Sequence, residues 1–251
     1  MIADAVLEVQ GLDVHFGGVQ ALRNLSFTIA PGKIIGVMGP NGAGKTTLFN
    51  LVTGVYRPSA GRIVFGGRPL QGLSPARIAR AGIGRTFQSG RPFANLTALE
   101  NVLVGLYYGA DVRRAGATDA KRRGQEVLDF VGLGKLADRP VASLNLTERK
   151  IVELARALAT RPRMLLLDEP LAGFNPLELE PAIRIVRRIR DELGITVMWI
   201  EHIMTVLMET CEHLIVLHHG EKLAEGTPGE IAADAAVGDA YFGKKGATKL
   251  G

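Results

Sequence analysis

The stretch GKIIGVMGPNGAGKTT, residues 32–47, combines a short apolar run, a glycine-rich turn and the beginning of a helix. Its second half fits the pattern G-x-x-x-x-G-K-[ST] from Gly39 to Thr46. Glycines let successive backbone N–H groups curl around phosphate oxygens, and the positive end of the helix adds to the attraction. In this pattern Lys45 reaches the terminal phosphates and the Thr46 hydroxyl binds Mg²⁺. The stretch therefore predicts a phosphate loop, formed by Gly39, Pro40, Asn41, Gly42, Ala43, Gly44, Lys45, Thr46 and Thr47.

A second apolar run, MLLLDE at residues 164–169, ends in two carboxylates. An apolar run followed by an acidic pair is by itself typical of an ordinary strand end. Beside a phosphate loop it favours catalysis, so we expect Asp168 to bind Mg²⁺, directly or through water. Glu169 is then the expected general base for the attacking water.

Gln88 and His202 each follow an apolar run, GIGRTF and TVMWIE respectively. A lone glutamine or histidine is usually a solvated loop residue. Ligands of α/β sheets lie outside the carboxyl ends of the strands, so the shared position of these two residues favours a role in the site. We expect Gln88 to touch both Mg²⁺ and the attacking water, and His202 to polarise the leaving phosphate.

An aromatic residue, Phe16 in VHFGG, lies ahead of the phosphate loop. It is either a core aromatic or a ring that stacks on a purine base. The sequence contains no N-K-x-D pattern, so a guanine-binding site of the common GTPase kind is not visible. Adenine is favoured, which makes ATP the expected nucleotide.

The order of the predicted elements indicates an α/β fold. The first third alternates as strands in VLEVQGLDVHF and LRNLSFTIA. MLLLDE and TVMWIEH are nearly continuous apolar runs, as buried parallel strands should be, and a helix from Asn175 to about Gly194 separates them. Alternation of strands and helices predicts a covered, mostly parallel sheet.

Residues 89–150 differ from the rest because strand signals vanish and two helices replace them. One helix opens at Thr97 with Glu100 three residues later, and the other runs from about Asp119 to Val131. This pattern predicts an inserted helical lobe. The expected division is an ATP-binding core of residues 1–88 and 151–226, a helical lobe with the signature region at 89–150, and a C-terminal helix with a basic tail at 227–251.

Composition narrows the class of protein. With 251 residues and 47% hydrophobic content, the chain can bury a sizeable core. Its single cysteine, Cys211, forms no internal disulfide, which fits a reducing compartment. The N-terminus has no secretory pattern, and no stretch approaches the roughly 20 apolar residues that a spanning helix needs. We therefore expect a protein that is neither secreted nor membrane-spanning.

The net charge of +5 comes from 30 Lys and Arg against 25 Asp and Glu. This modest excess fits a solvated surface, with contact to nucleic acid or anionic lipid as the alternative. The local basic runs are Arg113, Arg114, Lys121, Arg122, Arg123, Lys244, Lys245 and Lys249.

The ordered set of motifs resembles that of ABC-type ATPases over nearly the whole chain. It consists of GPNGAGKTT, TFQ ending at Gln88, ARAL at 155–158, MLLLDEP, and IEH ending at His202. FGGVQAL, GIGRTFQSGRPFANLTALENVLVG, AGFN at 172–175, EGTPGEI and DAYFG are similar to the larger ATPase subunit of branched-chain amino acid importers. The resemblance implies a P-loop NTPase with an ABC-type core, in which a mostly parallel sheet joins an N-terminal antiparallel β portion, and an inserted α-helical lobe.

Two regions depart from that family's pattern: the signature, in which serine, both glycines and glutamine are all replaced, and the loop after the catalytic strand. Counting back from ARAL, its L-S-G-G-Q signature falls on Leu144, Asn145, Leu146, Thr147 and Glu148. Asn175, in the loop implied to lie at the dimer interface, stands where an aspartate is usual.

The stretch LNLTERK has the chemistry of a capped helix, because Asn145 can accept a backbone N–H while Glu148 reaches back. In ABC dimers, as the resemblance implies, each ATP lies between one phosphate loop and the partner's signature helix. An ionised Glu148 about 5 Å from a phosphate charge would be repelled by roughly 3 kcal/mol at an effective dielectric near 20. Unless Arg149 or Lys150 turns toward the phosphate, this face should therefore hold nucleotide weakly.

The favoured function is the ATP-binding and ATP-hydrolysing subunit of an ABC transporter that energises solute import, with branched-chain amino acids as the implied solute. The expected cofactors are ATP and Mg²⁺. The expected partners are a second ABC ATPase, preferably in a heterodimer although a homodimer is possible, transmembrane permease subunits docked on the helical lobe, and indirectly a solute-binding protein. The expected location is peripheral, at the cytoplasmic face of the inner membrane. The alternatives are a soluble ABC ATPase acting on nucleic acid or ribosomes, although no nucleic acid is expected, and a non-hydrolysing regulatory cassette.

Overall fold

The computed structural model describes residues 6–87, 92–109 and 117–242. Contacts along the chain define two compact units, Met1–Pro75 with Arg190–Gly251 and Ala76–Ile189. The two units are called the first and the second unit below. The division predicted from sequence, with a lobe at 89–150, partitions the chain differently and stays a prediction.

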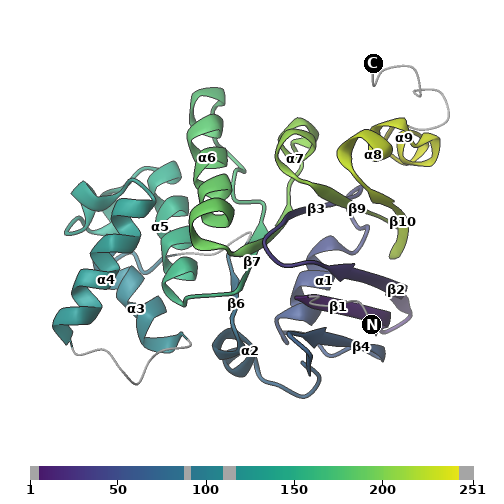
Figure 1. Ribbon diagram of the computed structural model, residues 1–251, viewed down its shortest axis with the longest axis horizontal. Helices are drawn as coiled ribbons and strands as arrows, with labels where there is room; N and C mark the ends of the chain where they lie inside the picture. Colours follow the sequence, from purple (N-terminus) through teal and green to yellow (C-terminus); the bar gives the residue numbers. More distant parts are fainter. Residues whose placement is uncertain (1–5, 88–91, 110–116, 243–251) are drawn as a thin grey trace. The chain divides into compact units, whose positions relative to one another are not determined.

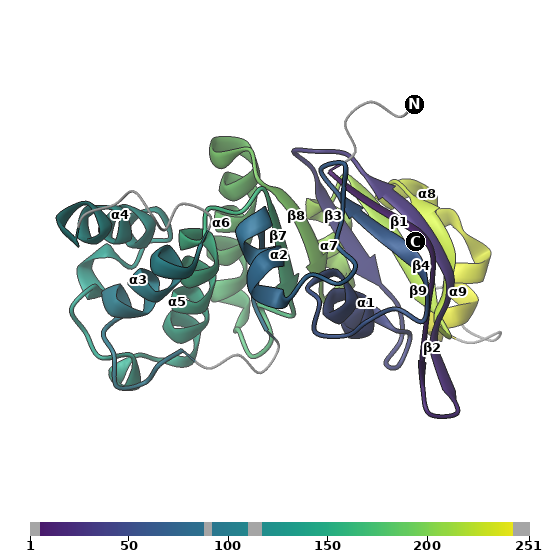
Figure 2. The same ribbon diagram turned by 90° about the horizontal axis from the view of Figure 1, so that it is seen from below.

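The first unit opens with an antiparallel sheet in the order β2-β1-β4-β5. Its strands are β1 (Leu7–Phe16), β2 (Val19–Ile29), β4 (Ala60–Phe65) and β5 (Arg68–Pro69). Strand β1 alternates buried and more exposed positions, as the sequence pattern predicts for a sheet with one core face. Figure 2 shows the long hairpin of β1 and β2. The expected N-terminal antiparallel portion is confirmed.

The other sheet of the first unit places β3 (Ile34–Met38) at its centre. Strand β3 pairs in parallel with β8 (Thr196–Ile200) and with β9 (His213–His218), and β10 (Glu221–Gly226) adds antiparallel to β9. All five residues of both β3 and β8 are buried, which explains their nearly continuous apolar sequence.

Helices cover both faces of this sheet. In Figure 1, α1 (Lys45–Val52) lies on one side, with α7 (Met204–Thr210) and α8 (Pro228–Ala233) on the other. A Cβ on Gly36 of β3 would lie 2.5 Å from Leu214 Cδ2 and 3.1 Å from Cys211 Sγ, so a larger residue there would displace these side chains. One small helix was predicted from about Thr227, and the structure has a second, α9 (Ala235–Phe242), after the break at Asp234.

The second unit combines a parallel strand pair with a group of helices. Strand β6 (Ile83–Arg85) pairs with β7 (Met164–Asp168). Helix α3 packs against both α4 and α5. The helices are α2 (Pro75–Ala81), α3 (Ala98–Tyr108), α4 (Ala117–Phe130), α5 (Leu146–Ala159) and α6 (Pro176–Leu193), with short 3-10 turns at Gly134–Leu136 and Val141–Ser143; α2 begins and α6 ends in the first unit.

The two helices predicted within residues 89–150 are present as α3 and α4. Helix α3 begins with the predicted capping box, in which Thr97 accepts from the Glu100 backbone at 3.1 Å and Glu100 accepts from the Thr97 backbone at 2.8 Å. Helix α4 ends at Phe130, followed by Gly132 in the left-handed region with φ 83°. Local capping chemistry therefore located both helices correctly.

Candidate nucleotide site

The loop between β3 and α1 forms the predicted phosphate-binding turn. Gly44 is the N-cap residue of α1 with φ 104°, and no described side chain caps this helix start. A Cβ on Gly44 would lie 2.9 Å from the Ala21 carbonyl oxygen and 2.6 Å from Leu22 Cδ2. Glycine is therefore required both for the backbone conformation and for the close approach of β2.

Lys45 lies inside this loop. Its ammonium group donates to the backbone oxygens of Gly39 at 2.6 Å and Pro40 at 3.1 Å, and only 6% of the residue is exposed. The loop thus curls around a buried cation, while Asn41, Gly42 and Thr46 are exposed. A helix start with backbone donors and a lysine beside them is suited to binding an anion such as a phosphate chain.

His202 reaches the same edge of the sheet as the phosphate loop. Val37 of β3 pairs with Ile200 of β8, and the two strands are parallel, so Gly39 and His202 both lie two residues beyond this pair. His202 is exposed, and its backbone N–H donates to the neighbouring Glu201 carboxylate at 3.2 Å. The structure therefore brings His202 to the strand ends where ligands of α/β sheets bind.

The candidate base-stacking residue Phe16 lies at the end of β1. Phe16 is 43% exposed, and its ring packs edge-on against that of Tyr56, with ring centroids 4.9 Å apart. The sequence did not single out Tyr56. It also missed Tyr241 of α9, whose phenol has a pKa raised to about 12 by burial, opposed by a hydrogen bond with the backbone of Gly39.

The second unit holds the two candidate carboxylates at the end of β7. Asp168 is 1% exposed, its Oδ2 accepts a hydrogen bond from Arg85 at 2.8 Å, and its backbone N–H donates to Thr86 Oγ1 at 3.2 Å. Glu169 is 7% exposed and has a left-handed φ of 51°, and its carbonyl accepts from Lys150 at 3.3 Å. A non-glycine residue held at positive φ stores strain, which commonly occurs at functional sites.

Two charged residues of this region were missed by sequence reasoning. Glu153 on α5 accepts the backbone N–H of Phe87 at 2.9 Å, and burial raises the pKa of its carboxyl group. The other residue is Arg85. Both could have been noticed as charges within apolar sequence, since Arg85 interrupts the run GIGRTF and Glu153 falls between apolar positions of α5. Gln88, the predicted glutamine of the site, lies outside the described residues.

The signature region is a self-capped helix start, as predicted. Asn145 Oδ1 accepts from the Glu148 backbone at 2.8 Å, and Glu148 Oε2 accepts from the Asn145 backbone at 2.9 Å. Arg149 donates to the carbonyl oxygens of Leu144 at 2.8 Å and Ala142 at 2.7 Å. Lys150 donates to the Glu169 carbonyl oxygen. Both basic residues that follow the cap, Arg149 and Lys150, are thus hydrogen-bonded to backbone carbonyls of this chain.

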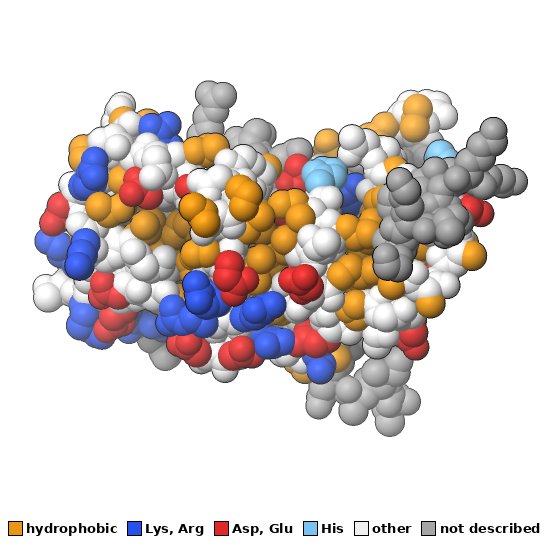
Figure 3. Space-filling view, turned by 90° about the horizontal axis from the view of Figure 1, so that it is seen from above, with side chains coloured by type: hydrophobic (Ala, Val, Ile, Leu, Met, Phe, Trp, Pro, Cys, Tyr) orange, Lys and Arg blue, Asp and Glu red, His pale blue; other side chains and the backbone are white. Residues whose placement is uncertain are grey.

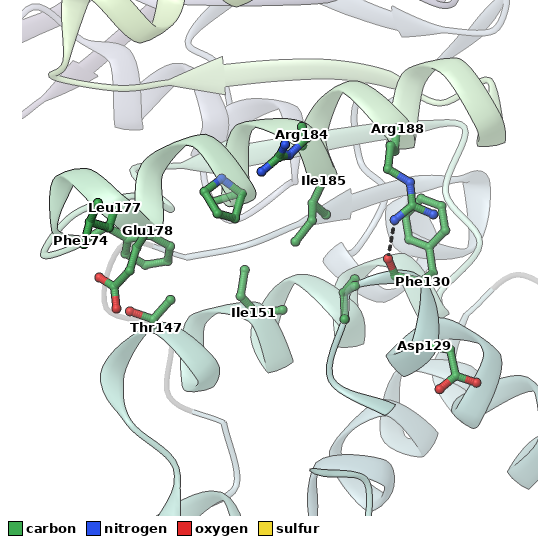
Figure 4. A pocket seen from close by; sticks show the side chains of 14 residues that line it. Asp129, Phe130, Thr147, Ile151, Phe174, Leu177, Glu178, Arg184, Ile185 and Arg188 are labelled. Atoms are coloured by element: carbon green, nitrogen blue, oxygen red, sulfur yellow. Dashed lines mark hydrogen bonds between the residues drawn. The ribbon is translucent and has the colours of Figure 1, made fainter. Parts of the chain in front are cut away.

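A groove of about 510 Å³ opens beside this helix start, and Figure 4 shows it between α5, α6 and the end of α4. Its apolar lining includes Ile151, Phe174, Leu177 and Ile185. At the far end Arg188 donates to the Phe130 carbonyl at 2.9 Å and lies over the Phe130 ring. Asn175 lies next to the groove as the cap of α6, accepting from Leu177 and Glu178 N–H groups at 2.9 and 3.2 Å.

Basic and acidic side chains lie close together on helix α4 and on one face of the described part. On the face shown in Figure 3, Lys and Arg side chains are interspersed with Asp and Glu side chains. On α4, Arg122 pairs with Asp119 and Glu126, and Arg123 pairs with Asp119. The basic residues 113, 114, 244, 245 and 249 lie outside the described residues. Within the described ranges, every helix is too short or too polar to cross a bilayer.

A buried strand that leads through a glycine loop around a lysine into a helix defines a P-loop nucleotide-binding protein. Residues 22–172 match the family model described as ABC transporter. The chain is 38% identical over 251 residues to the branched-chain amino acid transport ATP-binding protein BraF of Pseudomonas aeruginosa, covering 95% of this chain and 98% of BraF. It is 37% identical to the corresponding protein LivG of Escherichia coli, covering 97% and 100%. The chain belongs to the ATP-binding proteins of ABC transporters, which are ATPases.

Solved structures agree with this assignment. A nucleotide-free ATP-binding cassette of an ABC transporter matches with a TM-score of 0.85 and 30% identity, covering 96% of this chain and 100% of that one. A dimeric cassette bound to ADP and Pi matches with a TM-score of 0.79 and 25% identity, covering 88% and 98%. The predicted ABC-type α/β fold is confirmed.

Proposed function

We propose that this chain is the ATPase subunit that energises import of branched-chain amino acids through separate membrane subunits. The observation that carries the choice of solute is the likeness to BraF and LivG over nearly the full length of each chain. The protein then works at the cytoplasmic face of the inner membrane, held there by permease subunits that dock on the lobe of residues 89–150. A solute-binding protein delivers the amino acid to those permeases, and nucleic acid has no part in the cycle.

The nucleotide of this proposal is ATP with Mg²⁺. The loop of residues 39–47 binds the phosphates, with Lys45 on the terminal ones, and Phe16 stacks on adenine. The hydroxyl of Thr46 and the carboxylate of Asp168 are oxygen donors, which Mg²⁺ prefers, and Gln88 is the third candidate ligand. When bound, Mg²⁺ would neutralise the negative charge that develops on the phosphate. Glu169 takes the proton of the attacking water, and His202 polarises the leaving phosphate.

The same proposal includes a second ATPase chain with an intact signature. Support comes from the self-capped start of α5, where the Asn145 and Glu148 side chains accept the backbone N–H groups of Glu148 and Asn145 respectively. Arg149 and Lys150 are held by backbone carbonyls and thus are not displayed toward an incoming phosphate. Asn175 likewise uses its side chain to cap α6. One composite site, on this chain's Lys45, is then strong, and the site facing residues 145–148 is weak.

The test is the ATPase rate of the purified chain alone, together with size exclusion of a Glu169→Gln variant in ATP. We expect a slow rate and no ATP-driven homodimer, because two self-capped signatures would face the two nucleotides. A brisk rate with a stable homodimer would contradict the hetero-pair.

Reconstitution with the partner ATPase and the permeases completes this test. Lys45→Ala in this chain should reduce ATPase activity by about 10² or more, the scale of losing a preorganised charge at a reaction centre. The equivalent change in the partner should reduce it less. Equal losses would contradict the asymmetry, and leucine uptake that does not depend on ATP would contradict the assigned solute transport.

A further inference from the structure

The pair of Arg85 and Asp168 is a fully buried ion pair next to the candidate catalytic residue. The side chains are 4% and 1% exposed, and Arg85 Nη2 donates to Asp168 Oδ2 at 2.8 Å. Arginine keeps its charge at any ordinary pH, so its burial here fixes a permanent positive charge against this carboxylate. Arg85 lies in the stretch GIGRTF, but none of the roles assigned above uses it.

Three consecutive residues of this segment are tied to the elements that carry the candidate site. Arg85 bonds to Asp168, and Thr86 both accepts from the Asp168 backbone and donates its own N–H to the Leu166 carbonyl at 3.0 Å. Phe87 donates its N–H to the buried Glu153 carboxylate of α5, and its ring lies 4.7 Å from the Arg85 guanidinium carbon. The side chain of Arg85 is thus held by the Asp168 carboxylate and the Phe87 ring, while the bonds of Thr86 and Phe87 hold the backbone beside it.

We propose that Arg85 is a positioning residue that orients the Asp168 carboxylate so that it can serve Mg²⁺ bound with ATP. This inference rests on the proposed role of Asp168. A guanidinium holds one carboxylate oxygen in a fixed plane, which determines where the other oxygen points. Residues that hold a metal-binding side chain in place strengthen metal affinity without contacting the metal.

A purely structural role does not explain why this pair is charged. Strands β6 and β7 are already joined by their own ladder, in which Gly84 pairs with Leu165 and Arg85 with Leu166. Burying two charges carries a desolvation penalty, and replacing a buried ion pair by well-packed apolar side chains of similar volume is often neutral or stabilising. Orientation of Asp168 explains why a charge is present at this position.

The experiment is calorimetric titration of the full chain with the non-hydrolysable ATP analogue AMP-PNP, once with excess Mg²⁺ and once with EDTA. The variants are Arg85→Met, which loses the charge, and Arg85→Lys, which keeps the charge but loses the planar fork. Arg188→Met is the matched control, since Arg188 is another arginine of the second unit that bonds to a backbone carbonyl and stacks on Phe130. Thermal unfolding of each variant monitors folding.

Mg²⁺ should increase the affinity for AMP-PNP about tenfold or more less in Arg85→Met than in the unmodified chain, as for other residues that hold metal ligands. In EDTA, the affinity of Arg85→Met for AMP-PNP should equal that of Arg188→Met. Arg85→Lys should lose part of the tightening, and it carries the test alone if Arg85→Met does not fold. An unchanged or stronger effect of Mg²⁺, or equal losses with Mg²⁺ and with EDTA, would overturn the inference. Asp168→Asn distinguishes failure of this inference from failure of the proposed role of Asp168. If Asp168→Asn keeps the full tightening by Mg²⁺, the proposed role of Asp168 is itself wrong.

Discussion

The starts of α1 and α5 are two helix N-termini in one chain that treat their backbone donors in opposite ways. At α1 the cap residue is Gly44, no described side chain caps the helix, and Lys45 lies inside the loop. At α5 the cap residue is Asn145, and Glu148 completes a reciprocal capping box. Both ends have the same dipole and the same kind of donors.

The difference shows that a helix dipole does not make a phosphate site by itself. The donors at the start of a helix attract an anion only when the chain's own side chains have not already used them. A carboxylate in the first turn also complements the helix dipole from within, so an external phosphate would have to displace or face it. The sequence difference between glycine and a capping residue therefore separates a binding site from a structural helix start.

Substitution of Gly44 should have the largest effect on the difference between the two helix starts. Gly44→Ala places a Cβ at φ 104° and 2.9 Å from the Ala21 carbonyl oxygen, so the loop must move. We expect ATP affinity to fall by about 10² or more, the scale on which loss of preorganised donors acts. Titration calorimetry with ATP in EDTA measures this loss.

Gly42→Ala is the matched control for that variant. Gly42 also has a positive φ, 79°, but a Cβ there meets no atom within 4 Å. The loss for Gly42→Ala should therefore be clearly smaller, because only backbone strain of about 1–3 kcal/mol opposes it. Equal losses at the two glycines would show that the packing against β2 does not hold the loop.

The phosphate loop and the capped start of α5 could both be predicted from sequence because each depends on neighbouring residues alone. Glycine spacing, the N-cap and the residue three positions later are local signals with local physical causes. The same holds for the strand ends at Asp168 and His202, which the apolar runs located.

The contacts of Arg85, Glu153 and Tyr241 could not be predicted in the same way. Arg85 meets Asp168 across 83 positions, and Glu153 meets Phe87 across 66. These contacts depend on which strands pair and which helix packs beside them, and a single sequence does not specify such long-range pairing. The charge within an apolar run was a visible signal, but its partner was not.

The start of α5 can also be converted into one that resembles a phosphate-binding helix start. Replacing Asn145, Leu146, Thr147 and Glu148 by serine, glycine, glycine and glutamine removes the carboxylate and the side chains at the helix start. In the Glu169→Gln background we expect this variant to form ATP-driven dimers roughly tenfold more readily, because backbone donors become accessible to a phosphate. Size exclusion in ATP measures the change.

Asn145→Ser alone is the control, since serine caps a helix about as well as asparagine. It should leave the dimerisation of the Glu169→Gln protein unchanged. A quadruple variant that stays monomeric in ATP would indicate that features beyond residues 145–148 prevent self-association.

The smallest expected effect is the contribution of the Asn145 cap to the free energy of unfolding. Asn145→Ala removes the acceptor of the Glu148 N–H and should lower the free energy of unfolding by about 1 kcal/mol, the usual cost of losing such a cap. Thr97→Ala at the start of α3 removes the same bond in the same unit and should cost a similar amount in urea unfolding. Since Glu148 remains in Asn145→Ala, ATP-driven dimers should not appear. If Asn145→Ala costs much less than Thr97→Ala, the box at α5 contributes little to stability, and its donors are more available to a ligand than the hydrogen bonds indicate.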